Sequence, residues 1–341
     1  GIYHIEVLDS LSCSKVSQSM RIWPKPQATI TADGLCLGSE LKTNVPDSNV
    51  TQINWYRNDE LIKVANRRFK DIKETLVGQG SSLAISSGIT NIGDFFVRDD
   101  GNIYILDNAL NRVVLFNEKL QTMSTVAGGN GSGSGLNQFG SNARGIFVTT
   151  QGDIYIADAA NHRILKWTPG AAQGIVVAGA TGVSSAGLNR LSNPFDIFLD
   201  YSGNLFISDQ GNNRVVRWSP GATSGVVVAG GTQGSGLTQL NTPRGIFVTK
   251  EGVLYVVDAV NARVLRFQPG VNAGTVVAGG IGAGVGLNNL SSPIAVFVDE
   301  QENIYVSDES NGRITRWKVG SLFGQLVIGM DQNGGQYNSI G

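Results

Sequence analysis

A segment of 12 residues occurs five times in this chain of 341 residues, at a nearly constant spacing. The copies align without a gap, and their aspartates lie 51, 51, 49 and 50 residues apart. A unit of this length is too long for a leucine-rich or ankyrin repeat and suits four short strands with their loops. The copies are NIYILDNALNRV, DIYIADAANHRI, NLFISDQGNNRV, VLYVVDAVNARV and NIYVSDESNGRI, which begin at Asn102, Asp153, Asn204, Val253 and Asn303.

Each repeat unit contains four short apolar segments separated by turn residues, a pattern that predicts four strands. The second and third segments each carry an aromatic residue at a fixed position, and the fourth leads into a glycine-rich loop. Because sheets repeated around an axis leave few exposed edges, the sequence predicts an all-β propeller with one blade per unit. The first segments end in Phe96, Phe147, Phe198, Phe247 and Phe297.

The pattern D-x-x-N-x-R between two strands, preceded by GN-[IL]-[YF], resembles the NHL-repeat family of β-propellers and covers about residues 83 to 330. Two copies depart from it. Leu110 stands where asparagine is expected, with Asn111 one place later, and Glu302 replaces the turn glycine. The resemblance implies an NHL-type propeller with five clear blades, and we expect a six-bladed ring in which the sixth blade is shared or missing.

The repeated aspartates and arginines have the residue types of a ligand ring, but their presence in every unit favours a task that every blade needs. We expect each arginine to pair bidentately with the aspartate five residues earlier, across the turn between two strands. We expect Asn161, Asn212, Asn261 and Asn311 to cap the backbone of these turns. The predicted structural pairs are Asp107 with Arg112, Asp158 with Arg163, Asp209 with Arg214, Asp258 with Arg263, and Asp308 with Arg313.

Related six-bladed propellers include amidating lyases, lactonases and strictosidine-synthase-like proteins, which use metal ions or acid–base groups at the central channel. This chain has only two histidines, His4 outside the repeats and His162 at a variable turn position, so no histidine cluster is expected within one chain. We therefore predict no metal site, no cofactor and no enzymatic activity. With a net charge of −1 and no basic stripe, nucleic acid is not an expected partner. Membrane insertion is not expected either, since no apolar run is long enough to span a bilayer.

Residues 1–71 lack the repeat. Within residues 24–71, the segments PQATITADGLCLGSELKTNV and TQINWYRNDELIKV resemble the A to C′ strands of an immunoglobulin-like sandwich, with Trp55 in strand C. Residues 1–23 resemble the F–G hairpin that normally ends such a domain. We therefore expect a donor hairpin in residues 1–23, an immunoglobulin-like half-module in residues 24–71 and the propeller in residues 72–341. Residues 72–80 resemble the fourth strand of a blade, which either closes the ring or indicates a fragment of a longer polypeptide.

This layout resembles bacterial surface proteins in which immunoglobulin-like modules and NHL repeats alternate. The resemblance implies a disulfide between Cys13 and Cys36, and hence an extracellular or cell-surface location; the alternative is two free thiols. Three sequons in predicted loops, at Asn49, Asn130 and Asn289, make covalent glycans an expected modification in a host that glycosylates.

A half-sandwich has unpaired strand edges that another segment must complete. Residues 1–23 complete it either in an adjacent copy, which generates a head-to-tail homopolymer, or in their own chain. The first arrangement predicts a non-enzymatic structural subunit of an extracellular fibre or surface layer. The alternatives are an adhesin or binding module that recognises a glycan or protein on the propeller face, and a lyase or lactonase-like enzyme.

Strand donation between chains with a Cys13–Cys36 bond across each junction predicts covalent multimers. Non-reducing electrophoresis of the denatured protein should then show a ladder that collapses to the monomer band on reduction. A monomer band without reductant contradicts this arrangement.

Overall fold

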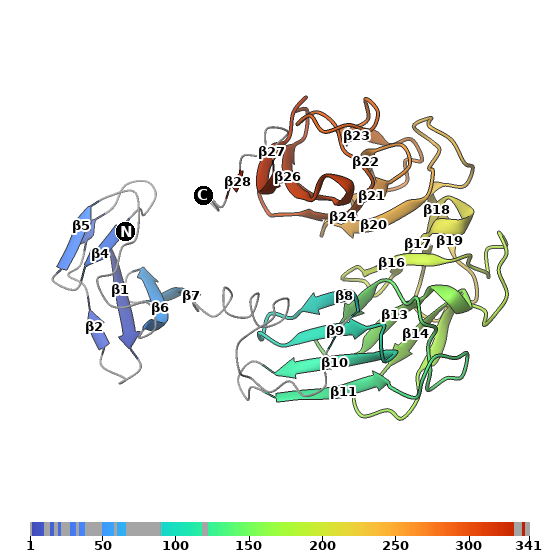
Figure 1. Ribbon diagram of the computed structural model, residues 1–341, viewed down its shortest axis with the longest axis horizontal. Helices are drawn as coiled ribbons and strands as arrows, with labels where there is room; N and C mark the ends of the chain where they lie inside the picture. The colour runs from blue at the N-terminus through green and yellow to red at the C-terminus, as the bar shows by residue number, and fades with distance from the viewer. Residues whose placement is uncertain are drawn as a thin grey trace. The chain divides into compact units, whose positions relative to one another are not determined.

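The structure is a computed structural model that describes residue 89, residues 91–117 and residues 122–329 in full. It also describes the backbone of Met330 and of the strands within residues 2–65 and 336–337. The chain divides into two compact units, residues 1–88 and 89–341 (Figure 1). Apart from short 3-10 turns the described elements are strands, so the predicted all-β class is confirmed. No helix in the described part of the chain is long and apolar enough to cross a membrane.

The second unit is a β-propeller of five antiparallel sheets, one for each repeat unit. The first three blades consist of β8 (Ile92–Val97), β9 (Ile103–Asp107), β10 (Arg112–Asn117) and β11 (Thr122–Gly128); β12 (Ile146–Val148), β13 (Ile154–Asp158), β14 (Arg163–Trp167) and β15 (Ile175–Gly179); and β16 (Pro194–Leu199), β17 (Leu205–Asp209), β18 (Arg214–Trp218) and β19 (Val226–Gly230).

The last two blades repeat this order of four strands, and a short fifth strand pairs with the edge of the final sheet. They consist of β20 (Pro243–Val248), β21 (Leu254–Asp258), β22 (Arg263–Phe267) and β23 (Thr275–Gly279); and β24 (Pro293–Val298), β25 (Asn303–Asp308), β26 (Arg313–Lys318), β27 (Gln325–Met330) and β28 (Gln336–Tyr337). The four predicted strands per unit are therefore confirmed. A sixth sheet is not found in the described part of this unit, and residues 72–80 lie outside the described residues.

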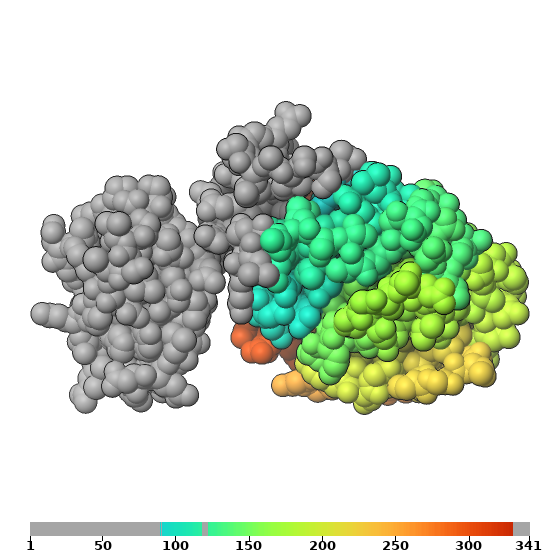
Figure 2. Space-filling model, turned by 90° about the horizontal axis from the view of Figure 1, so that it is seen from below, coloured from blue at the N-terminus to red at the C-terminus, as the bar shows by residue number. Residues whose placement is uncertain are grey.

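The innermost strands β8, β12, β16, β20 and β24 follow one another around the propeller axis, and Figure 1 labels all of them except β12. Each of the first four packs against the next, whereas β24 shows no comparable packing against β8. Among the described residues the blades therefore form an open arc. From outside, the blades lie side by side in chain order (Figure 2).

The repeated aspartate and arginine form an ion pair in every blade, with Nε–Oδ2 distances of 2.7 to 3.0 Å. In the second blade, Asp158 and Arg163 are 0% exposed. Only Nε of Arg163 donates to Asp158, while Nη1 donates to the carbonyl oxygen of Ser134, and Nη2 to those of Gly135 and Gln138. In the second to fifth blades each arginine donates to its aspartate through Nε alone, so the expected bidentate pairing is wrong in these blades. Because the guanidinium carries five N–H donors, it also holds the loop that precedes its own blade.

The asparagine of the motif has a different task from the predicted one. Asn161 Nδ2 donates to both carboxylate oxygens of Asp158 and to the carbonyl oxygen of Gly133, so it too reaches the preceding loop. The equivalent amides bind in the same way, each to its aspartate and to one loop carbonyl. These are Asn212, Asn261 and Asn311.

The two departures from the repeat pattern are accommodated by the backbone. Glu302 has a φ of 58°, in the left-handed region that Gly252 occupies at the same turn with a φ of 81°. Leu110 points to solvent, and Asn111 takes the left-handed position of its turn with a φ of 50°.

In the first unit, β2 (Ser14–Val16), β1 (Ile2–Asp9), β6 (Val50–Arg57) and β7 (Glu60–Ala65) form one sheet in this order, and β3 (Met20–Arg21) also pairs with β1. A separate hairpin joins β4 (Ala28–Thr31) and β5 (Gly34–Leu37). β1 runs antiparallel to β6, with Tyr3 opposite Arg57 and Val7 opposite Ile53. The first segment thus pairs within its own chain, one of the two arrangements left open by the sequence.

Exchange of this strand between chains stays a prediction, as do the immunoglobulin-like interpretation and the boundaries after residues 23 and 71. Cys13, Asn49 and the side chain of Cys36 lie outside the described residues, and so does the predicted disulfide.

Breaking the pair in the third blade tests its structural role. Asp209→Ala leaves the cation of Arg214 buried without its carboxylate, so we expect a loss of about 3 kcal/mol in unfolding free energy. A double-mutant cycle with Arg214→Ala should show coupling above about 1 kcal/mol. The control is the pair of Lys166 and Asp153, which at 2.8 Å is nearly as short as the 2.7 Å of the tested pair but is 23% and 21% exposed, and whose coupling should be smaller. Equal coupling in both cycles contradicts the role of burial.

Candidate functional site

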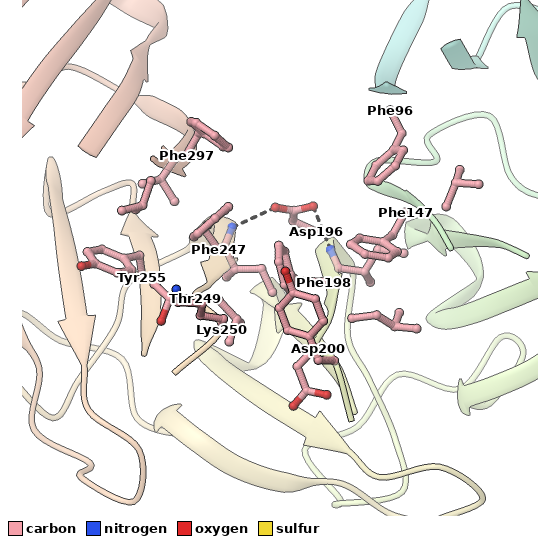
Figure 3. A pocket seen from close by; sticks show the side chains of 18 of the residues that line it. Phe96, Phe147, Asp196, Phe198, Asp200, Phe247, Thr249, Lys250, Tyr255 and Phe297 are labelled. Atoms are coloured by element: carbon pink, nitrogen blue, oxygen red, sulfur yellow. Dashed lines mark hydrogen bonds between the residues drawn. The ribbon is translucent and has the colours of Figure 1, made fainter. Parts of the chain in front are cut away.

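A cavity of about 1580 Å³ lies at one end of the propeller axis. It is lined by the last residues of the innermost strands and by the turns that follow them, so all five blades contribute to its wall. Each blade supplies the phenylalanine that lies one residue before the end of its innermost strand, because the repeat places this residue at the same height in every blade. These are Phe96, Phe147, Phe198, Phe247 and Phe297, which follow one another in an arc (Figure 3).

Successive phenylalanine rings are in contact. From Phe96 to Phe297 their centroids lie 5.0, 5.4, 5.2 and 5.3 Å apart, in tilted or edge-to-face arrangements. The described residues include no ring contact between Phe297 and Phe96, so the row is open where the arc of blades is open. Phe297 is 54% exposed. The sequence predicted that these residues end the first strand of each unit. It did not predict that they line one cavity, because this depends on how neighbouring blades pack against each other.

The turns around the cavity carry charges of both signs. Arg98 pairs with Asp100 at 3.1 Å and donates to the carbonyl oxygen of Thr150. Asp200 accepts hydrogen bonds from the backbone N–H groups of Ser202 and Asn204 in its own turn. Much of this polar rim therefore stabilises the turns, while the strand ends inside it supply mostly phenylalanine and aliphatic side chains.

Two carboxyl groups lie on the innermost strands. Asp196 accepts from the backbone N–H of Ile197 through Oδ1 and from that of Ile246 through Oδ2, both at 2.8 Å (Figure 3). Asp94 makes the same pair of bonds, with Phe95 at 2.8 Å and Ile146 at 2.9 Å. An innermost strand has no neighbour on its axial edge, so these carboxylates satisfy N–H groups that would otherwise lack a partner. They link the first blade to the second and the third to the fourth.

The environment of these carboxyls favours their neutral form. Burial raises the pKa of Asp196 to about 6. Burial and the neighbouring Asp196 raise the pKa of Asp94 to about 8. Both groups therefore exchange protons near neutral pH.

Sequence analysis missed Asp94 and Asp196, although a signal was present. The same repeat position is aspartate in the first and third blades, Gly145 and Gly245 in the second and fourth, and Ala295 in the fifth. Glycine is needed at position 145 because a Cβ there would lie 2.8 Å from Oδ1 of Asp196. This alternation distinguishes Asp94 and Asp196 from the residues that every blade shares.

None of the ten predicted Asp and Arg residues lines the cavity, and each pair lies at a turn of its own blade. The predicted glycosylation sites Asn130 and Asn289 lie in loops between blades, and Nδ2 of each donates to a backbone carbonyl. A glycan would be attached at that atom, so its attachment would replace these bonds. Within residues 91–117 and 122–329, no group of three or more His, Cys, Asp or Glu side chains is placed to hold a metal ion.

No protein-family model and no curated protein matches the chain. Solved structures do. A chain of a nidogen/laminin complex is 15% identical with a TM-score of 0.54, and the match covers 95% of this chain and 92% of that one. An auxiliary nutrient binding protein from Bacteroides ovatus is 14% identical with a TM-score of 0.52, over 80% and 67% of the two chains. Virginiamycin B lyase from Staphylococcus aureus is 15% identical with a TM-score of 0.47, over 80% and 78%. At these identities the first two show a shared β-propeller fold.

The raised pKa of Asp94 predicts a pH-dependent stability. The folded protein keeps this proton up to about pH 8, whereas the unfolded chain releases it near the ordinary aspartate pKa of 3.8, so stability falls as the pH rises between these values. The melting temperature should therefore be lower at about pH 9 than at about pH 5, and Asp94→Asn should flatten this dependence. Asp99→Asn, which removes an exposed carboxylate from the next turn, is the control. An unchanged slope in Asp94→Asn refutes the prediction.

Proposed function

We propose that this protein is a non-enzymatic, extracellular or cell-surface binding module whose central cavity takes an apolar group of a peptide or protein partner. The observation that carries the proposal is the row of five phenylalanines in an open cavity of about 1580 Å³. Concave, mostly apolar sites with a few polar groups at their rim are typical of ligand pockets.

Solvent access to the aromatic wall supports this function. Phe297 in the fifth blade and Phe95 in the first both line the cavity, and they are 54% and 61% exposed. Contiguous apolar surface of this kind is costly to keep in water and marks interaction sites in soluble proteins. Covering it with an apolar side chain stabilises the complex by roughly 25 cal/mol for each Å² removed from water.

A peptide fits the wall better than a glycan does. Sugar hydroxyls need polar partners along the surface that they contact, whereas five phenylalanines form a continuous row along this wall and most of its charged residues lie in the turns at the rim. At the rim, Lys250 and Glu251 are exposed and present opposite charges, which suit the mixed charges of a polypeptide.

The carboxyls of Asp94 and Asp196 belong to the scaffold in this proposal. Each accepts two backbone hydrogen bonds and joins two blades. A lyase or lactonase-like activity, the alternative from sequence, would instead require one of these protons to reach a bound substrate.

A second proposal is a subunit of a head-to-tail fibre or surface layer, with other copies of the chain as partners. It requires the antiparallel pairing of β1 with β6, which the structure has within one chain from Tyr3 opposite Arg57 to Asp9 opposite Val50, to form between chains instead. The same pairing between chains would produce an open filament. The electrophoresis described above tests it.

Removing one exposed ring from the cavity tests the first proposal. Peptides selected from a random display library on the immobilised protein should carry aromatic or large aliphatic residues. Phe297→Ala should weaken their binding about tenfold, because apolar contact area is lost. Phe323→Ala is a matched control, since Phe323 is 60% exposed and does not line the cavity. Selected peptides that bind Phe297→Ala as tightly as the unchanged protein would rule the cavity out.

A further inference from the structure

Three residues at the start of successive innermost strands form a second cluster. Arg144 precedes β12, Phe195 lies at the start of β16, and Arg244 lies at the start of β20. They occupy one repeat position in the second, third and fourth blades, at the opposite end of these strands from the turns that line the phenylalanine cavity. None of the three lines that cavity.

Both arginines lie against the same aromatic ring. The Cζ atom of Arg144 is 5.1 Å from the centroid of Phe195, and that of Arg244 is 5.9 Å from it. Two guanidinium groups thus share one phenylalanine, an arrangement in which each gains a cation–π contact but repels the other.

The guanidinium of Arg144 makes no hydrogen bond or ion pair with a described residue, and its Nε is buried without an acceptor. The Nε of Arg244 is likewise buried without an acceptor. Nη1 of Arg244 donates to Oγ of Ser292 at 3.1 Å, and its contact with Glu309 is long, at 3.5 Å, to a carboxylate that is 57% exposed.

The arginines of the repeat, which stabilise the blades, differ from Arg144 in their hydrogen-bond partners. Arg163 donates to Asp158, to the hydroxyl of Thr181 and to three loop carbonyls. By contrast, burial and the charge of Arg244 lower the pKa of Arg144. The buried Nε atoms of Arg144 and Arg244 have no acceptor among the described residues, and an unsatisfied buried donor beside a like charge destabilises the folded protein.

We propose that Arg144 and Arg244 bind the carboxylate of a small organic acid whose apolar part packs on Phe195. A planar carboxylate accepts two N–H bonds from a guanidinium fork. The two arginines and Glu309 together carry one excess positive charge, which a single negative charge balances. This site is separate from the phenylalanine cavity and does not depend on the proposed peptide binding.

Benzoate is the probe, since it joins one carboxylate to one aromatic ring. Calorimetric titration at constant ionic strength should show one site per chain, and Arg144→Gln should weaken it at least about tenfold. Arg217→Gln, which removes an exposed arginine from β18 and the same charge, should bind as the unchanged protein does. No binding of benzoate, equal loss in both variants, or tighter binding of sulfate or phosphate than of benzoate would overturn the proposal.

A measurement without ligand separates binding from a scaffold role. If Arg144 awaits an anion, Arg144→Gln removes a repelled charge with unsatisfied donors, and its melting temperature should equal or exceed that of the unchanged protein. A fall of more than about 3 °C would show that Arg144 supports the fold, and would overturn the assignment of its guanidinium to a ligand.

Discussion

The propeller depends on a buried arginine whose N–H groups donate both to its own hairpin and to a neighbouring loop. In the second to fifth blades, the arginine binds the aspartate of its own hairpin and the carbonyl oxygens of the loop that arrives from the preceding blade. A buried guanidinium is costly unless all its donors are paired, so loop and hairpin must be in place together. The loop that arrives from the preceding blade therefore supplies acceptors that each of these blades needs. The repeat in sequence thus corresponds to a repeated packing contact between a blade and this loop.

A second constraint acts at the axis, where every innermost strand presents an unpaired edge. Asp94 and Asp196 solve this for two pairs of blades by accepting backbone N–H groups from both members of a pair. Glycine in the intervening blade makes room for the carboxylate. The alternation of aspartate and glycine thus repeats every two blades, whereas the motif residues repeat in every blade. The raised pKa values mean that these two carboxyls keep their protons to higher pH than exposed aspartates do.

Residues shared by all blades could be predicted from the sequence, and residues that differ between blades could not. Strands, turns and the ion pair of Asp209 with Arg214 repeat, so alternation and spacing reveal them. Arg144 and Arg244 occupy a position that varies among glycine, arginine, phenylalanine and isoleucine. Their meeting over Phe195 depends on contact between blades that a single repeat does not encode. The bidentate pairing was predicted wrongly because the loop carbonyls, distant in sequence, compete for the same donors.

The open arc has a consequence for how the propeller comes apart. A closed ring has no terminal blade, whereas an open array has two, and each terminal blade among the described residues packs against one neighbour instead of two. In linear arrays of this kind local unfolding begins at the ends and spreads inward, so the order of opening follows the order of the blades. The third blade, which carries Phe195, is then the last to open. The two arginines beside that ring project from the part of the molecule that frays least.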